Sequence, residues 1–191
     1  MGYEPFNILK SGGVPLPIEN VDTDQIIPAR FLKATERKGF GDNLFRDWRY
    51  HQDGTEIKNF VLNDKKYKGQ ILVGGKNFGS GSSREHAPWA LLDFGIRVVI
   101  STSFADIFFN NCFKNGILPI TLGPLDRDIL LDDADNGSNS RLTVNLKSQT
   151  IIRPNGETIH FKMDEFRKYC LLNGLDDIEL SLQKENKITE F

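Results

Sequence analysis

The sequence predicts an α/β protein: a mixed sheet flanked by helices and extended by a small antiparallel β unit. Between residues 71 and 122, short apolar runs alternate with helical patterns, and this β-α-β-α-β rhythm favours parallel or mixed strands with helices on the faces of the sheet. Between residues 142 and 161, alternating strands are separated by Pro154-Asn155-Gly156, a strong turn pattern. The second region therefore predicts the antiparallel unit.

Length and composition are those of one ordinary globular domain. The chain has 191 residues, of which 39% are hydrophobic and 26% charged, enough for one good core. No internal repeat or Gly/Pro-rich linker divides it. We expect a single domain over residues 1–191, with the C-terminal helices from about residue 163 onward as an extension.

Charge and hydropathy exclude several classes of function. The net charge of −2 gives no reason to expect nucleic acid or an anionic membrane as a partner. No apolar run approaches the roughly 20 residues that span a bilayer, and residues 1–5 lack the features of a secretory signal. We therefore expect a cytoplasmic protein.

The predicted elements before residue 71 are short. Residues 6–16 predict an edge strand, or two short strands with a turn at Ser11-Gly12-Gly13. Residues 43–48 predict a short helix, and Phe60-Val61-Leu62 predicts a short strand. Residues 71–75 then predict a buried strand.

Longer helices and regular strands follow. The first helix is expected to end at Gly95, and the second to run from a Ser103 cap to about Lys114. Their predicted inward side chains are Trp89, Leu91, Leu92 and Phe94 in the first, and Phe104, Ile107, Phe108 and Cys112 in the second. Further strands are predicted at 97–100, 117–122, 142–146, 150–152 and 158–161, and further helices at 126–133, 163–172 and 176–187.

The segment from Gly79 to Glu85 joins a strand to a helix and contains five glycines or serines in a row before Arg84. A Gly/Ser loop between a strand and a helix start is a common anion site, because the backbone approaches the ligand and free N–H groups point at it. The segment matches neither a P-loop, a serine-hydrolase elbow nor a dinucleotide fingerprint. What remains is a serine pair beside an arginine, whose fork matches a carboxylate.

A purely structural interpretation of this segment is also open. Ser82 and Glu85 have the spacing of a capping box, with Arg84 on a solvated face. Pro88 complicates that interpretation, because a helix starting at Ser83 would lose the hydrogen bond from position 88. Residues 82–86 are therefore expected to be irregular.

No metal site is predicted within this chain. Asp22-Thr23-Asp24 resembles half of a metal loop, but no further oxygen ligands follow at calcium-loop spacing, so a turn with local side-chain bonds is the simpler interpretation. The three histidines lack metal-ligand spacing. Cys112 and Cys170 are expected to be buried thiols, and two cysteines cannot hold an iron–sulfur cluster unaided.

The string Gly81-Ser82-Ser83-Arg84-Glu85-His86-Ala87 resembles the signature of the mobile swivel domain of the aconitase superfamily. The longer stretch 77–91 is similar to the small subunits of bacterial 3-isopropylmalate dehydratases, and the stretches 20–28, 103–108 and 173–176 agree in order. Ser80 stands where many members have cysteine, a position that shapes the loop. The resemblance implies a swivelling β/β/α fold.

The resemblance also implies an activity and a partner. The expected reaction is that of a hydro-lyase of leucine biosynthesis, which isomerises 2-isopropylmalate to 3-isopropylmalate through 2-isopropylmaleate. The family's [4Fe-4S] cluster is carried by a large subunit, so this chain is expected to bind no cofactor and to be active only with that partner. Two alternatives stay open: a related hydro-lyase acting on 2-methylmalate or a homocitrate-type acid, and a carboxylate-binding module without catalysis.

Site residues follow from the same resemblance. Ser82 is the expected base, which is chemically plausible only as an alkoxide held by N–H donors and a guanidinium in a dry site. Substrate contacts are expected from Gly81, Ser83, Arg84, Arg30 and Asp24. A loop over about Phe31–Phe40 is expected to sort substrates, with candidate residues Phe31, Leu32, Lys33 and Arg37.

Overall fold

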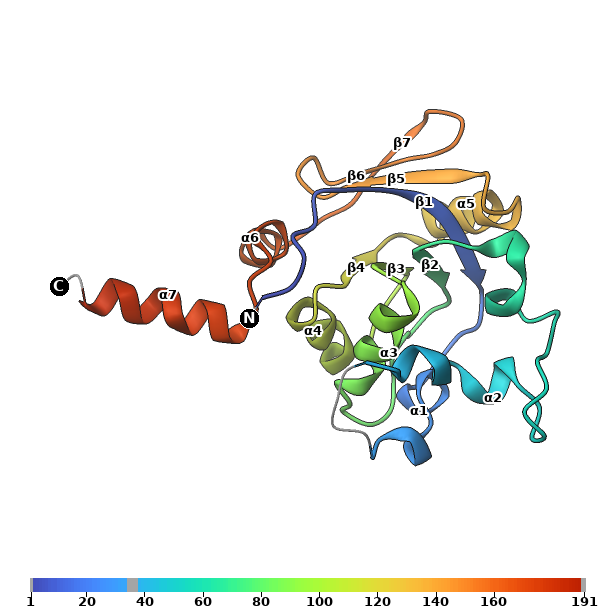
Figure 1. The fold of residues 1–191 in the computed structure, drawn as a ribbon. Helices are drawn as coiled ribbons and strands as arrows, with labels where there is room; N and C mark the ends of the chain where they lie inside the picture. Colours follow the sequence, from blue (N-terminus) through green and yellow to red (C-terminus); the bar gives the residue numbers. More distant parts are fainter. Residues whose placement is uncertain (1, 34–37, 190–191) are drawn as a thin grey trace.

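A seven-stranded mixed sheet runs through the computed structural model, which describes residues 2–33 and 38–189 (Figure 1). The strand order is β4-β3-β2-β1-β5-β6-β7. The strands are β1 (Ile8–Leu16), β2 (Ile71–Gly74), β3 (Val98–Ser101), β4 (Leu118–Thr121), β5 (Arg141–Asn145), β6 (Thr150–Ile152) and β7 (Thr158–His160). The predicted α/β class, with an antiparallel unit added to a sheet flanked by helices, is confirmed.

Strand β1 lies at the centre of the sheet, and its two halves pair with their neighbours in different directions. Its second half pairs in parallel with β2, and its first half, from Ile8 to Gly12, pairs antiparallel with β5. The expectation of an edge strand, or of two strands broken by a turn, was wrong. Pro15 is tolerated because β5 pairs with the other half of β1, so the missing N–H interrupts no bond to β5.

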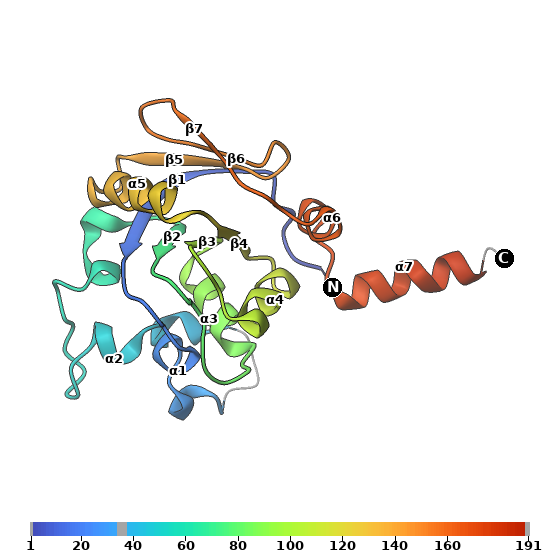
Figure 2. The ribbon, with the colours of Figure 1, turned by 180° about the vertical axis from the view of Figure 1, so that it is seen from behind.

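Helices cover both faces of the parallel half of the sheet. They are α1 (Thr23–Ile26), α2 (Arg46–Arg49), α3 (His86–Phe94), α4 (Asp106–Lys114), α5 (Pro124–Asp135), α6 (Glu165–Asn173) and α7 (Asp177–Thr189), with 3-10 turns at Ala29–Phe31, Phe40–Asn43, Val61–Asn63 and Lys65–Tyr67. Helices α3 and α4 pack on one face and α5 on the other, while α7 projects away from the body in both views (Figures 1 and 2).

Two hydrophobic clusters result from the period of two along the strands. In β2, Ile71 and Val73 face the cluster that includes α5, whereas Leu72 faces the cluster that includes α3 and α4. All three side chains are fully buried. A strand covered on both faces is a continuous apolar run, which is why this stretch was recognisable from sequence.

Two sequence predictions in this region were wrong. Residues 60–62 do not form a strand; a 3-10 turn spans Val61–Asn63, because the Asn63 amide bonds the Arg49 and Ile57 carbonyls and folds the segment back. Ser103 does not cap α4, which begins at Asp106, since its hydroxyl accepts the Asn77 N–H at 2.9 Å instead.

The later start of α4 also changes which side chains face inward. Phe104 precedes the helix, so the helical face that buries Phe108 and Cys112 leaves Ile107 51% exposed. The remaining helices and strands fall close to their predicted places. Helix α5 is longer than expected, and α3 and α6 end at Gly95 and Gly174 in the left-handed conformation.

Candidate functional site

The predicted signature loop connects β2 to α3 and turns sharply at two glycines. Gly79 and Gly81 have φ values of +86° and +92°, a region that side-chain-bearing residues rarely adopt. Phe78, just before them, is fully buried and anchors the start of the loop. The loop therefore leaves the core abruptly and reaches the surface within a few residues.

A segment about 60 residues earlier in the chain holds this loop in place. Backbone bonds run from Gly79 N–H to the Val21 carbonyl at 2.7 Å and from Thr23 N–H to the Ser80 carbonyl at 2.8 Å. The buried Thr23 hydroxyl also donates to the Ser82 carbonyl at 2.9 Å. The loop is thus fixed through its backbone, which leaves its side chains free.

The same segment starts with a capping box of its own. The Asp22 carboxylate accepts the Gln25 N–H at 2.7 Å, and the Gln25 side chain accepts the Asp22 N–H at 3.0 Å. The prediction of a turn with local side-chain bonds is confirmed for Asp22. Asp22 therefore caps helix α1, which supports the loop.

Ser82 and Ser83 lie on the surface of the loop. Both are exposed, and within the described residues neither hydroxyl has a hydrogen-bond partner. The capping-box interpretation of Ser82 and Glu85 is wrong: α3 begins at His86 without a side-chain cap, and the Glu85 carboxylate accepts the Asn115 amide at 3.2 Å. The two serines therefore stand available to a ligand.

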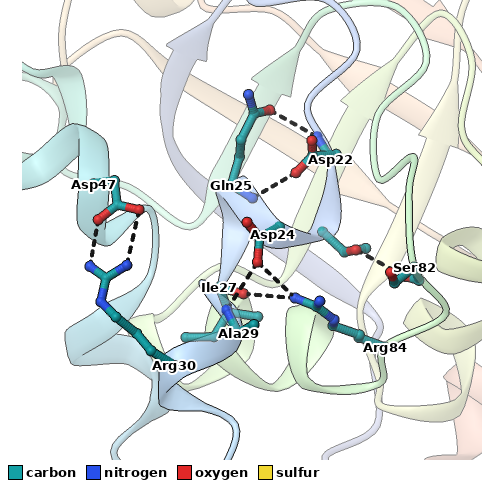
Figure 3. A network of polar contacts seen from close by, with 10 residues as sticks. Asp22, Asp24, Gln25, Ile27, Ala29, Arg30, Asp47, Ser82 and Arg84 are labelled. Carbon is teal, nitrogen blue, oxygen red and sulfur yellow. Dashed lines mark hydrogen bonds and ion pairs between the residues drawn. The ribbon is translucent and has the colours of Figure 1, made fainter.

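Arg84 lies against α1 with its side chain 19% exposed. Its Nη1 donates to Asp24 Oδ1 at 3.1 Å and to the Ile27 carbonyl at 3.4 Å, and Asp24 Oδ1 also accepts the Ala29 N–H at 3.0 Å (Figure 3). Among the described residues, Nε and Nη2 of Arg84 donate no hydrogen bond. One edge of the guanidinium is thus fixed while the other stays open for a carboxylate.

Arg30 points in a different direction from Arg84. Figure 3 shows its guanidinium paired with both carboxylate oxygens of Asp47, with Nη1 donating at 3.2 Å. These hydrogen bonds raise the pKa of Arg30 and lower the pKa of Asp47. The structure therefore brings Asp24 to the loop that carries Gly81, Ser82, Ser83 and Arg84. Arg30 lies beside this group, in a separate ion pair with Asp47.

Phe31 and Leu32 follow Arg30 and are half-buried against the cluster that includes α3 and α4, while Lys33 is exposed. A cavity of about 660 Å³ opens next to Phe31 and is lined by Arg30 and residues of the α2 region. Arg37, the fourth predicted loop residue, lies outside the described residues. The substrate-sorting role of this loop stays a prediction.

Sequence reasoning missed the supporting roles of two residues. Thr23 bonds the Ser82 carbonyl across 59 positions, and Asp47 pairs with Arg30 across 17. No local pattern marks either, because each acts on a partner that only the fold brings close.

The described residues of this chain do not fit an iron–sulfur cluster. Within the described residues, no group of three or more His, Cys, Asp or Glu side chains could hold a metal ion. Cys112 is buried in α4, and burial raises the pKa of its thiol, which disfavours the thiolate that a cluster needs. Cys170 is buried separately in α6.

None of the described helices has the length and apolar character needed to cross a membrane.

Comparison with known proteins identifies relatives along nearly the whole chain. Residues 3–124 match the family model described as the aconitase C-terminal domain, and residues 128–165 match the model described as LeuD_N. The chain is 61% identical to the 3-isopropylmalate dehydratase small subunit of Paramagnetospirillum magneticum and 60% identical to that of Jannaschia sp.. Each alignment covers 98% of this chain and 94% of the relative.

A solved structure agrees with these relatives. The crystal structure of 3-isopropylmalate dehydratase (leuD) from Methanocaldococcus jannaschii superimposes with a TM-score of 0.70 at 28% identity. The match covers 96% of this chain and 99% of the other. The resemblance inferred from the signature is confirmed.

Proposed function

The chain belongs to the family of 3-isopropylmalate dehydratase small subunits, in the aconitase superfamily, and we propose that it supplies half of an active site. The other half would lie on a large subunit, which the name of its relatives implies. The pair would convert 2-isopropylmalate to 3-isopropylmalate in leucine biosynthesis. We place this assembly in the cytoplasm.

One observation carries the proposal: the signature loop is rigidly fixed through its backbone yet presents its serines on an open surface. Thr23 and the Val21 carbonyl hold the loop, while Ser82 and Ser83 are exposed. A complete active site would exclude water from such groups. An exposed and rigid loop is what one half of a site needs before a second protein covers it.

Removing and re-adding water demands a base for a weakly acidic C–H proton. We assign this role to Ser82, which precedes Arg84 by two residues on the same loop. The cation and nearby backbone N–H groups would stabilise the alkoxide once a partner excludes water. Ser82 would take the C–H proton, while the hydroxyl on the adjacent carbon would leave as water with a proton and polarisation supplied by the large subunit, giving 2-isopropylmaleate. Water would then add to the carbon that lost the proton, and Ser82 would return its proton to the carbon that lost the hydroxyl.

Arg84 is assigned to one substrate carboxylate. Its open Nε/Nη2 edge suits a bidentate contact, and Asp24 holds the opposite edge at 3.1 Å. Ser83 and the backbone at Gly81 would add hydrogen bonds to the same carboxylate. Arg30 is a candidate for a second substrate contact. This contact would require Arg30 either to break its ion pair with Asp47 or to bind the substrate while still paired.

We assign the [4Fe-4S] cluster that the family implies to the large subunit, because the described residues of this chain offer no ligand set for it. The small chain would therefore be inactive alone.

The test is an anaerobic assay on 2-isopropylmalate with the large subunit, comparing the wild-type chain with Ser82→Ala. We expect turnover only when both chains are present, and a loss of about 10²–10⁴-fold in kcat for Ser82→Ala. Ser148→Ala, an exposed serine in the turn between β5 and β6, is the matched control and should retain full activity.

Two results would contradict the proposal. Near-full activity of Ser82→Ala would show that the base lies elsewhere. Turnover of 2-methylmalate but not of 2-isopropylmalate would support the shared active site but show that the proposed substrate is wrong.

A further inference from the structure

Asp93, in the last turn of α3, bonds the backbone that returns from the proposed substrate-sorting loop. Its Oδ2 accepts the Gly39 N–H at 3.0 Å and the Gly41 N–H at 2.8 Å. An acidic side chain near a helix C-terminus opposes the helix dipole. The position of Asp93 is therefore unfavourable for α3 itself, and its two bonds to a distant segment give it a tertiary role.

The backbone at Gly41 lies directly against the end of α3. A Cβ added at this glycine would come within 2.6 Å of Phe94 N and 2.9 Å of Asp93 Oδ2. No other residue type fits so close an approach without a shift of the backbone. The close contact between the backbone at residue 41 and the end of α3 therefore depends on glycine at this position.

The same face of α3 holds the residue between the two glycines. Phe40 is 3% exposed and packs edge-on against His86, with ring centroids 5.4 Å apart, and against Trp89 at 5.9 Å. His86, Trp89 and Asp93 recur at i, i+3 and i+7, which places them on one side of the helix. We call residues 38–41 the returning arm, seated on this face.

Both described ends of the loop are therefore tied to the signature segment. At the start, Asp24 accepts the Ala29 N–H and also holds Arg84. At the end, Asp93 holds the returning arm on the helix that begins two residues after Arg84. We propose that Asp93 is a positioning residue, which fixes the returning arm relative to Arg84 and thereby sets how the enzyme selects its substrate. This inference rests on the proposed function.

The first test uses the chain alone and needs no activity. Trypsin cleavage after Lys38, in the returning arm, should become about 5- to 30-fold faster in Asp93→Ala, the factor given by losing about 1–2 kcal/mol of net hydrogen bonding. Asp93→Asn retains one oxygen, and a single oxygen accepts both N–H groups, so its cleavage should stay near the wild-type rate. Asp132→Ala, an exposed acid in the last turn of α5, is the matched control and should change nothing.

The second test measures kinetics of the assembled enzyme on 2-isopropylmalate and 2-methylmalate. For Asp93→Ala we expect KM for 2-isopropylmalate to rise about 5- to 30-fold with kcat within about 2-fold, and the preference for 2-isopropylmalate to fall. Asp93→Asn should restore most of both. If Asp93 only stabilised the fold, Asp93→Ala would lower the apparent kcat in proportion to the folded fraction and would leave KM and the substrate preference unchanged.

Several outcomes overturn the inference. Equal cleavage of Asp93→Ala and wild type shows that the bonds do not hold the arm. Faster cleavage with unchanged KM and preference shows that the arm does not act on substrate selection. If the wild-type pair is inactive on both acids, the proposed function fails and the substrate-selection part of this inference falls with it, while the cleavage test still decides whether Asp93 anchors the arm.

Discussion

Replacing Gly79 with alanine should destabilise the protein through one identifiable contact. The glycine has φ +86°, and an added Cβ would lie 2.2 Å from Cγ and 2.5 Å from Cβ of Phe108. Phe108 is 2% exposed in α4 and packs against the Phe78 ring at 5.4 Å, so it has little room to move. The substitution therefore strains the signature loop and the core beneath it together.

Two costs add in this variant. Holding a side-chain-bearing residue in the left-handed region costs about 1–2 kcal/mol, and overpacking a buried site costs about 1–3 kcal/mol. Their sum is about 2–5 kcal/mol. For a chain of this size each kcal/mol lowers Tm by about 2–4 °C, so a decrease of about 4–20 °C is expected.

Gly156→Ala separates the two costs. This glycine has φ +89° with no atom within 4 Å of an added Cβ, so only the backbone cost of about 1–2 kcal/mol applies. Urea and thermal unfolding followed by circular dichroism would measure both variants. In a Phe108→Ala background, which lacks the clashing Cγ, Gly79→Ala should cost less than in the wild type, because the two residues are in contact. Equal destabilisation of Gly79→Ala and Gly156→Ala would refute the reasoning.

Three further predictions concern other parts of the molecule. Arg153→Met should cost about 2–4 kcal/mol in urea unfolding at neutral pH, because it leaves the buried Asp133 carboxylate without bonds of 2.8 and 3.1 Å; a loss below about 0.5 kcal/mol would contradict this. Cys112 should resist a thiol reagent in the folded chain and react in denaturant, since burial raises the pKa of its thiol; labelling of the native protein at this position would show that α4 opens. The Arg30 hydrogen bond lowers the pKa of Asp47, so the contribution of this pair to stability is fully present above the unfolded pKa of about 3.9 and is lost as pH falls through the lower folded value. In an NMR titration Arg30→Ala should raise the midpoint of this carboxyl, and an unchanged midpoint would show that the pair does not form in solution.

Local patterns in the sequence were sufficient for most elements and for the identity of the signature. The apolar run at 71–75, the αL caps at Gly95 and Gly174, and the turn at 154–156 depend on neighbouring residues alone. The string from Gly81 to Ala87 was recognisable because its chemistry is concentrated in consecutive residues.

The failures have a common physical cause. Residues 6–16 showed strand alternation, but a strand becomes central or peripheral only through its partners, and those are β2 and β5. Ser103 is a residue type that commonly caps helices, but its hydroxyl accepts the Asn77 N–H instead. In the first case the strand's place depends on its partners, and in the second a non-local hydrogen bond outweighed a local capping preference of about 1 kcal/mol.

Periodicity, turns and caps are interactions between neighbours along the chain, so the order of strands and helices, and the consecutive serines and arginine of the signature loop, could be read from the sequence. The bond from Thr23 to the Ser82 carbonyl, the pairing of Asp24 with Arg84 and the bonds from the returning arm to Asp93 appear only in the folded structure. Each of these contacts joins residues more than 50 positions apart, and their distance is set by the packing of α1 and α3 around a shared core.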